Sequence, residues 1–247
     1  MRYVVKCAYK GTDFHGWQIQ PNAFSVQEAL ENALSTFFRT KIEITGSSRT
    51  DTGVHAAEQF AHFDIDFEIS DIKRTCHALN AILPLGIAVL GIFHVNDDFH
   101  TRFNATHRRY LYRINQVKNP FFIDSSYYFK LPLDLGKMNM ASEILLKHTD
   151  FQCFSRVKTD VATFNCKIDL ACWEMKDGFL LFHIRADRFL RGMVRAIVGT
   201  MIEVGTGKIS LEDFEEILLS KNRSNAGMAV PPQGLTLVEV GYTHLFS

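Results

Sequence analysis

The sequence predicts an α+β protein whose two related halves divide near residue 105. The first half has the order strand, helix, strand, strand, helix, strand, and a second mixed set of strands and helices follows it. No low-complexity linker separates the two sets, so we expect them to pack closely. We therefore predict an N-terminal subdomain at residues 1–105 and a C-terminal subdomain at residues 106–247. The halves share no strict sequence repeat, which makes their relatedness a structural hypothesis.

The elements of the first half follow from local pattern. Residues 3–9 read as a strand that ends at a turn. Ser25 is suited to cap a helix, and the apolar positions 26, 30, 34, 37 and 38 after it have helical spacing. Residues 46–53 are too rich in Gly, Ser and Thr for a core element, so they form a loop of the kind that often presents functional groups. The other expected elements are, in order, strands at 42–44 and 60–67, a helix at 72–83 that stops at Pro84, and a strand at 87–95.

The second half is read in the same way. Residues 108–115 alternate, with Arg109 on one face of the expected strand and Tyr110 on the other. The turn signal Lys-Asp-Gly at residues 176–178 lies between two apolar runs and predicts a hairpin. The other expected elements are helices at 135–148, 188–204 and 210–219, the last capped by Ser210, and a closing strand at 237–242.

Charge is balanced in total but uneven along the chain. There are 27 basic and 27 acidic residues, which argues against nucleic-acid binding over the whole surface. Two segments are strongly basic, however, and residues 99–123 contain no acidic residue at all. The basic residues of the two segments are Arg102, Arg108, Arg109, Arg113 and Lys118 in the first, and Arg185, Arg188, Arg191 and Arg195 in the second. These clusters favour local contacts with phosphates.

The cysteines and the apolar runs bear on the expected compartment. The chain has five cysteines, an odd number without C-x-x-C spacing, which is typical of reduced thiols. The N-terminus has the pattern of a strand and not of a signal peptide. No apolar run approaches the roughly 20 residues that span a bilayer. We expect a cytoplasmic protein that does not enter the membrane.

The string SRTDTGVH at residues 48–55 is the strongest chemical signal. A bare T-D-T-G is most simply a tight loop whose Asp accepts local hydrogen bonds. Here Arg49 stands two residues before Asp51 and can hold the carboxylate ionised. An ionised, partly desolvated carboxylate can act as a nucleophile or stabilise a positive centre on a sugar.

This string resembles the catalytic motif of the tRNA pseudouridine synthase A family, G-R-T-D-x-G-V-H, with Ser48 in place of the usual Gly. A Ser is less suited than Gly to a positive φ, so the loop conformation is in question at that position. Further segments resemble the family in the same order over nearly the whole chain. They are YKGTDFHGWQ at 9–18, FHTRF at 99–103, RRYLY at 108–112, FQCFS at 151–155, FLRGMVRAIVG at 189–199 and PPQGL at 231–235.

The resemblance implies a pseudouridine synthase fold, with two ferredoxin-like or RRM-like halves, a continuous mainly antiparallel sheet, and a cleft between the halves. It implies that Asp51 is the catalytic aspartate and that Arg49 positions the flipped nucleotide. Tyr110 would pack on the target base and assist proton transfer, and Arg195 would pair with the aspartate. It also implies conversion of uridine to pseudouridine at positions 38, 39 and 40 of the tRNA anticodon stem-loop, by a homodimer.

Each of these assignments has a plainer alternative. Tyr110 in an alternating strand is equally suited to core packing, although the neighbouring Arg108 and Arg109 disfavour a fully buried strand. Arg188, Arg191 and Arg195 would share one face of a helix, which is either solvated or in contact with RNA phosphates. The substrate-binding residues that we predict are Tyr110, Arg102, Arg108, Arg109, Arg188 and Arg191. The aromatic pair Phe14 and Trp17 would be exposed to RNA or packed in the core.

The chemistry needs neither a metal nor a cofactor. Isomerisation of uridine breaks the N-glycosidic bond, turns the base over and joins C5 to the sugar, so nothing is oxidised. The sequence contains no phosphate-binding loop, dinucleotide fingerprint or zinc quartet. The alternative functions are a non-catalytic module that binds structured RNA and a carboxylate-dependent hydrolase or nuclease. Aromatic and basic residues together make RNA, and by the resemblance tRNA, the expected partner.

Overall fold

The computed structural model describes residues 1–157 and 161–243 and has an α+β architecture. The described chain contains five α-helices and nine strands with mostly antiparallel pairing, which confirms the predicted fold class. It divides into two compact units. Unit 1 comprises Met1–Thr106 together with the chain from Leu237 onward, and unit 2 comprises His107–Thr236. The last strand, which we had assigned to the C-terminal subdomain, thus belongs largely to unit 1.

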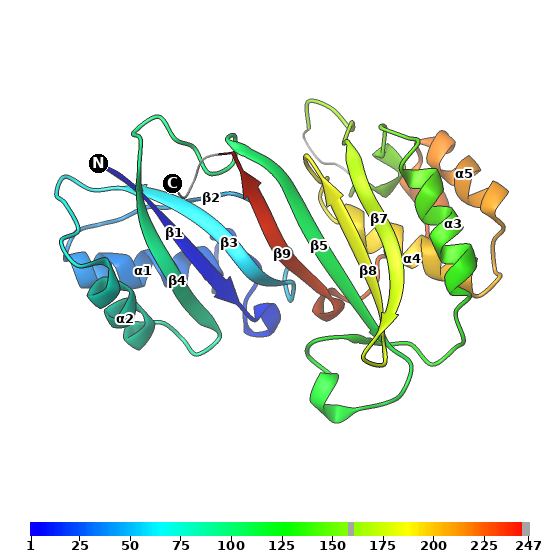
Figure 1. Ribbon diagram of the computed structural model, residues 1–247, viewed down its shortest axis with the longest axis horizontal. Coiled ribbons are helices and arrows are strands. Elements are labelled where there is room, and N and C mark those ends of the chain that lie inside the picture. The colour runs from blue at the N-terminus through cyan, green and yellow to red at the C-terminus, as the bar shows by residue number, and fades with distance from the viewer. Residues whose placement is uncertain (158–160, 244–247) are drawn as a thin grey trace. The chain divides into compact units, whose positions relative to one another are not determined.

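Unit 1 is organised around its first strand (Figure 1). β1 (Arg2–Tyr9) runs antiparallel to both β3 (His55–Asp64) and β4 (Ile87–Val95), so it is the central strand. Five of its eight residues are buried, and Val4, Val5 and Cys7 expose none of their surface. The other elements of the unit are α1 (Val26–Phe38), β2 (Thr45–Gly46), which pairs with β3, α2 (Ile72–Ile82) and β9 (Leu235–Tyr242).

The predicted strand at residues 42–44 is wrong. Ile42 and Ile44 are buried, but their backbones bond to side chains of α1 and not to a strand. The Ile42 amide donates to Ser35 Oγ over 2.9 Å, and the Ile44 amide donates to Glu31 Oε1 over 3.0 Å. Polar side chains of the helix thus satisfy the segment, and pairing with β3 begins only at Thr45.

Unit 2 contains a three-stranded antiparallel core (Figure 1). β8 (Phe179–Ala186) lies between β5 (Ala105–Asn115) and β7 (Ile168–Lys176). β7 and β8 form the predicted hairpin, whose turn residues Asp177 and Gly178 have φ angles of 52° and 81°. Two left-handed residues are the signature of a type I′ turn. The other elements are β6 (Tyr127–Tyr128), which pairs with β5, α3 (Leu135–Leu145), α4 (Met193–Gly205) and α5 (Leu211–Ser220).

α4 is the buried helix of unit 2, since 11 of its 13 residues are buried. The predicted helix over residues 188–204 is wrong at its start, because α4 begins only at Met193. Gly192 has a left-handed backbone with φ of 72°, which interrupts the helix on its N-terminal side. Arg188 and Arg191 therefore precede α4 and do not share a helical face with Arg195.

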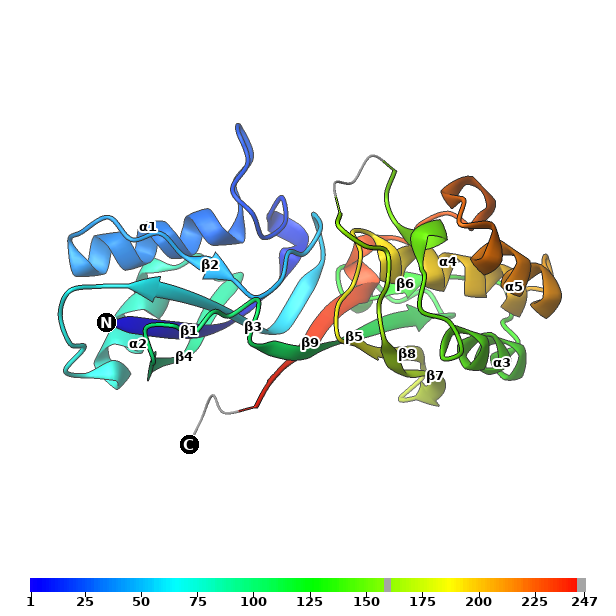
Figure 2. The same ribbon diagram turned by 90° about the horizontal axis from the view of Figure 1, so that it is seen from above.

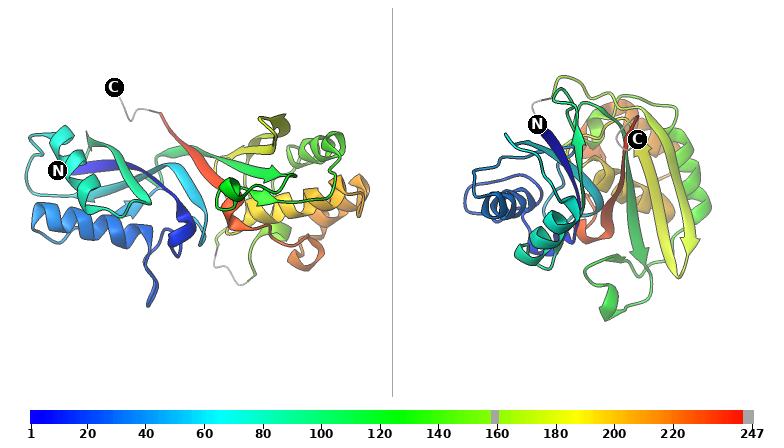
Figure 3. Two further views of the ribbon diagram at one scale, coloured as in Figure 1. Left: turned by 90° about the horizontal axis from the view of Figure 1, so that it is seen from below. Right: turned by 60° about the vertical axis from the view of Figure 1, so that its left-hand side comes forward.

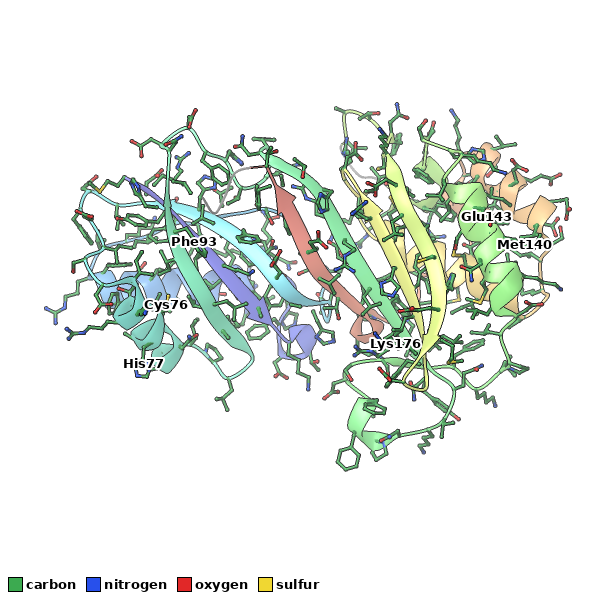
Figure 4. All side chains as sticks on the ribbon, in the orientation of Figure 1. Cys76, His77, Phe93, Met140, Glu143 and Lys176 are labelled. Carbon is green, nitrogen blue, oxygen red and sulfur yellow. The ribbon has the colours of Figure 1, made fainter. Side chains whose placement is uncertain are left out.

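The outer helices have exposed faces, as Figure 4 shows for His77 on α2 and for Met140 and Glu143 on α3.

All five cysteines are free thiols. Burial raises the pKa of Cys7, which exposes none of its surface, to about 12. Over the described residues, no helix is long and apolar enough to cross a bilayer.

The N-terminus of α5 generates a prediction about stability. Ser210 Oγ accepts a hydrogen bond from the Asp213 amide over 3.1 Å, and the Asp213 carboxylate accepts one from the Ser210 amide over 2.8 Å. Loss of such a cap costs about 1 kcal/mol, so we expect Ser210→Ala to lower Tm by roughly 2–4 °C. Glu216→Ala, at an exposed position of the same helix, is the matched control in thermal melting. An equal Tm for both variants would contradict the role of the cap.

His62 generates a prediction about pH. It is 7% exposed, and desolvation with help from Arg2 and His100 lowers its pKa to about 4, from an ordinary value of 6.5. Between these two pH values the unfolded chain binds more protons at this site than the folded chain does. The contribution of His62 to the free energy of unfolding should therefore be fully present above pH 6.5. It should be lost progressively as the pH falls towards 4. Urea titrations of the wild type and His62→Gln over this window test it, since the variant should show a shallower pH dependence.

Candidate active site

The loop at residues 48–55 leads from β2 into β3 in unit 1. Asp51 is half-buried, its neighbour Arg49 is exposed, and Thr50 between them is buried. The loop closes on itself through the Val54 amide, which donates to the Asp51 carbonyl over 3.1 Å. Gly53 supplies the left-handed residue of this turn, with φ of 78°. The sequence Asp-Thr-Gly-Val is thus a tight turn that leaves Asp51 between the core and the surface.

Thr50 fixes the loop to the chain that follows β1. Its hydroxyl shares a hydrogen bond with the Tyr9 hydroxyl over 2.9 Å, and its carbonyl accepts one from the Trp17 amide over 3.1 Å. Gly16 lies against the same carbonyl, because a Cβ at Gly16 would come within 2.6 Å of the Thr50 oxygen. Only a glycine fits this approach, and its φ of 86° also favours glycine.

A second contact holds the far end of the loop. The Gly11 amide donates to His55 Nδ1 over 2.9 Å, which requires this nitrogen to be unprotonated. A Cβ at Gly11 would lie 2.0 Å from the Val54 carbonyl oxygen, so the two segments touch through their backbones. The motif histidine therefore acts here as an acceptor that joins the loop to the segment at residues 9–18.

The start of the loop is held by Gln59 of β3. Its side-chain amide donates to the Ser48 carbonyl over 2.8 Å, and its oxygen accepts a short hydrogen bond from the Ser47 hydroxyl. Ser48 is not among the residues with positive φ. The substitution of Ser for the usual Gly is therefore compatible with this loop without backbone strain.

The aromatic residues of the segment at 9–18 lie inside the protein. Phe14 and Trp17 are 3% and 2% exposed, which decides for core packing over an exposed aromatic loop. The Trp17 indole covers Gly46 so closely that a Cβ there would come within 2.5 Å of the ring. The Trp17 ring thus packs against β2, the strand that leads into the Asp51 loop.

Unit 2 holds the predicted tyrosine. β5 alternates as expected, with Arg108, Tyr110 and Tyr112 buried and Arg109 half-buried on the other face. The Tyr110 ring meets the Phe189 ring edge-on, with 5.2 Å between centroids. Arg108 is buried in spite of its charge, and it donates to the Asp187 carbonyl over 3.0 Å. The segment after β8 thus contacts both side chains, through Asp187 at Arg108 and through Phe189 at Tyr110.

Arg195 lies in the first turn of α4 and is half-buried. Its Nε donates to the Val230 carbonyl over 2.7 Å, and the Val230 amide donates to the Arg195 carbonyl over 3.1 Å. Next to this contact, the Tyr112 hydroxyl donates to the Pro231 carbonyl over 2.8 Å. Val230 therefore holds α4, and Pro231, the first residue of the PPQGL segment, holds β5 within unit 2.

The remaining predicted arginines occupy separate places. Arg102 is exposed in unit 1, with its guanidinium 5.5 Å from the centre of the Phe103 ring. Arg109 pairs in register with Arg185 of β8 in unit 2. Arg191 is exposed in the turn before α4, and its carbonyl accepts the Arg156 amide over 3.1 Å. Arg188 follows Asp187, whose carboxylate accepts the Arg188 amide over 2.7 Å.

Several supporting residues were not predicted. His55 and Gln59 anchor the Asp51 loop, and Phe189 and Val230 support Tyr110 and Arg195. Phe189 belongs to a segment that the sequence already singled out, but its apolar side chain carried no chemical signal. In the part of the chain that the structure describes, no three His, Cys, Asp or Glu side chains form a group suited to a metal ion.

The geometry of unit 1 supports carboxylate chemistry. Asp51 is only partly desolvated, stands on a turn fixed at both ends, and follows an arginine in the chain. A fixed carboxylate that remains accessible can approach the carbon or proton of a bound substrate without reorganising its own loop. Unit 2 offers an aromatic hydroxyl, at Tyr110, and a half-buried guanidinium, at Arg195.

Comparison with known proteins identifies the family. A family model described as tRNA pseudouridine synthase matches residues 7–104 and 141–243. The chain is 48% identical to tRNA pseudouridine synthase A of Bacteroides fragilis over 242 residues, which cover 98% of this chain and 96% of the relative. It is 45% identical to the Parabacteroides distasonis protein of the same name, over 98% and 96% of the two chains. It is 46% identical to the Bacteroides thetaiotaomicron protein of that name, over 98% and 90%. The chain belongs to the tRNA pseudouridine synthase family.

Proposed function

We propose that this protein isomerises uridine to pseudouridine at positions 38, 39 and 40 of the tRNA anticodon stem-loop, with Asp51 as the catalytic carboxylate. The family membership supports the reaction and the tRNA substrate. The observation that carries the assignment to Asp51 is its position in the family motif, on a turn held by Thr50 and His55. We further propose that the enzyme acts as a cytoplasmic homodimer.

The reaction needs one carboxylate and a closed pocket. The bond between N1 and the sugar C1′ breaks, the uracil turns over, and C5 bonds to C1′. Finally C5 loses its proton and N1 gains one. Asp51 serves by attacking the sugar, by attacking C6 of the ring, or by removing a sugar proton. No group leaves the enzyme, so the pocket has to retain the detached base through its rotation.

We assign the other roles as follows. Arg49 positions the flipped nucleotide, Tyr110 packs on the target base and assists the final proton transfer, and Arg195 pairs with Asp51. The buried ring of Tyr110 beside Phe189 supports a stacking role, because the edge contact leaves the ring rigid. Phosphates of the tRNA are bound by the exposed or half-buried arginines of the two basic segments, namely Arg102, Arg109, Arg188 and Arg191. Arg108, being buried, supports the neighbouring residues of unit 2.

Replacement of the carboxylate tests the assignment. We expect Asp51→Asn to form no detectable pseudouridine and to retain tRNA affinity, because the amide keeps the size of the side chain and removes its charge. Unmodified tRNA is incubated with enzyme, and pseudouridine is mapped by carbodiimide adducts and primer extension.

Asp66→Asn, at an exposed position of unit 1, is the control and should keep wild-type activity. Full activity of Asp51→Asn would remove the catalytic assignment. A wild-type enzyme that binds tRNA without forming pseudouridine would favour the RNA-binding module, and released uracil or cut RNA would favour the hydrolase or nuclease.

Tyr110→Phe separates stacking from proton transfer. The ring is retained and only the hydroxyl is lost, so we expect tRNA affinity to stay constant and kcat to fall by about 10²-fold, the lower range for a general acid or base. Single-turnover kinetics measure this step.

Tyr112→Phe is the matched control, since Tyr112 lies on the same face of β5 and its hydroxyl bonds only to the Pro231 carbonyl among the contacts described above. It should lower stability and leave kcat unchanged. An unchanged kcat for Tyr110→Phe would restrict Tyr110 to packing.

A further inference from the structure

A short loop projects from unit 1 next to the Asp51 turn. It comprises residues 18–24, between Trp17 and the N-cap of α1, and we call it the arm. Figure 2 shows it as the blue loop that extends beyond α1, and the left view of Figure 3 shows it from the opposite side. Two backbone hydrogen bonds close its base, from the His15 amide to the Phe24 carbonyl over 3.0 Å and from the Val26 amide to the Gly16 carbonyl over 3.1 Å.

The arm has a defined conformation. Gln20 and Ala23 form an isolated antiparallel bridge across its tip. Asn22 within the turn has a φ of 61°, a left-handed conformation that Asn tolerates better than most residues. The Gln20 side chain donates to the His15 carbonyl over 2.7 Å, which ties the tip back to the base. These contacts order a loop that would otherwise sample many conformations.

The arm and the Asp51 turn share one attachment. The two residues that directly precede the arm, Gly16 and Trp17, are the same residues that pack on Thr50. A Cβ at Gly16 would lie 2.6 Å from the Thr50 oxygen and 3.2 Å from the Asp51 carbonyl carbon. The arm therefore stands at a fixed position relative to the catalytic carboxylate, within the same unit.

The surface of the arm is neutral and rich in amides. Gln18, Gln20 and Asn22 are exposed, and Ile19 between them is 43% exposed. Neither a carboxylate nor a lysine or arginine occurs from residue 14 to residue 27. Side-chain amides can donate to and accept from base edges, and an apolar side chain can contact an unstacked base. A surface without carboxylates does not repel phosphates, so its chemistry fits RNA.

We propose that the arm binds the RNA beside the target uridine and stabilises the opened stem. Ile19 contacts the base face that is uncovered when the uridine leaves the stack, and the arm amides contact the neighbouring base edges. Extrusion of a paired base costs free energy, and the cost is smaller for a mismatched base. Contacts that form only in the opened state offset part of this cost. The inference rests on the proposed function, since it places the arm beside the substrate of Asp51.

The test compares a paired with an unpaired target. Two tRNA transcripts are used, one with the target uridine in a Watson–Crick pair and one in which the opposite base is changed to a mismatch. We expect Ile19→Ala to lower kcat/KM about tenfold on the paired transcript, the effect of one lost contact of moderate strength, and much less on the mismatched one.

Ile82→Ala is the matched control, since Ile82 is 44% exposed in the same unit but lies on α2. It should match the wild type on both transcripts. Thermal melting confirms that each variant is folded, and Ile19→Gln, which keeps a long side chain without its apolar character, gives the same comparison if Ile19→Ala lowers Tm. In the Asp51→Asn background, Ile19→Ala should also lower the affinity for the paired transcript, in parallel with its effect on kcat/KM.

The outcomes are distinct. Equal losses on the two transcripts, or none on either, would overturn the role of the arm while the wild type still forms pseudouridine. If the wild type forms none on either transcript, the proposed function itself fails.

Discussion

The position of the carboxylate depends on one contact, the close approach of the chain after β1 to the backbone at Thr50. Gly16 makes this approach possible, and Gly11 permits a second one at Val54, because any Cβ at these positions would collide with main-chain atoms. Hydrogen bonds from Tyr9 and Trp17 then fix the loop in place. Two motifs that are separated in sequence are thus one structural unit. A catalytic group held in this way needs little reorganisation during the reaction.

Unit 2 uses the same principle with different means. The pleat of β5 turns Tyr110 inward and Arg109 outward, and the Phe189 ring limits the motion of the tyrosine. Two features fix the position of Arg195. They are the left-handed Gly192 at the N-cap of α4 and the Val230 carbonyl, which accepts a hydrogen bond from Arg195 Nε. Asp51 thus lies on a loop, Tyr110 lies within a strand and Arg195 lies at a helix start, and contacts within the same unit hold each of these segments.

Much of this could be predicted from the sequence. Strand alternation and helix caps gave α1, the β7–β8 hairpin and α5, and the motif gave the loop with Asp51, because these features depend on local preferences. The start of α4 could not be predicted, since a single glycine in an otherwise helical pattern does not show whether its backbone is helical or left-handed. The strand predicted at residues 42–44 was wrong because the pattern does not show that the backbone amides there bond to side chains of α1, at Ser35 and Glu31. The role of the arm could not be predicted because it depends on the contacts of Gly16 and Trp17 with Thr50, which are distant in the sequence.

The course of β9 has a consequence for how the chain is made. Unit 1 comprises Met1–Thr106, yet it also includes the chain from Leu237 onward. There the Val240 amide donates to Glu58 Oε1 over 3.2 Å, and the Tyr242 hydroxyl donates to the Thr101 carbonyl over 2.6 Å. A nascent chain on the ribosome can complete unit 2 first, although unit 1 emerges earlier. The carboxylate-bearing half acquires β9 only after the whole of unit 2 has been synthesised, so a product that ends before Leu235 would lack part of that half.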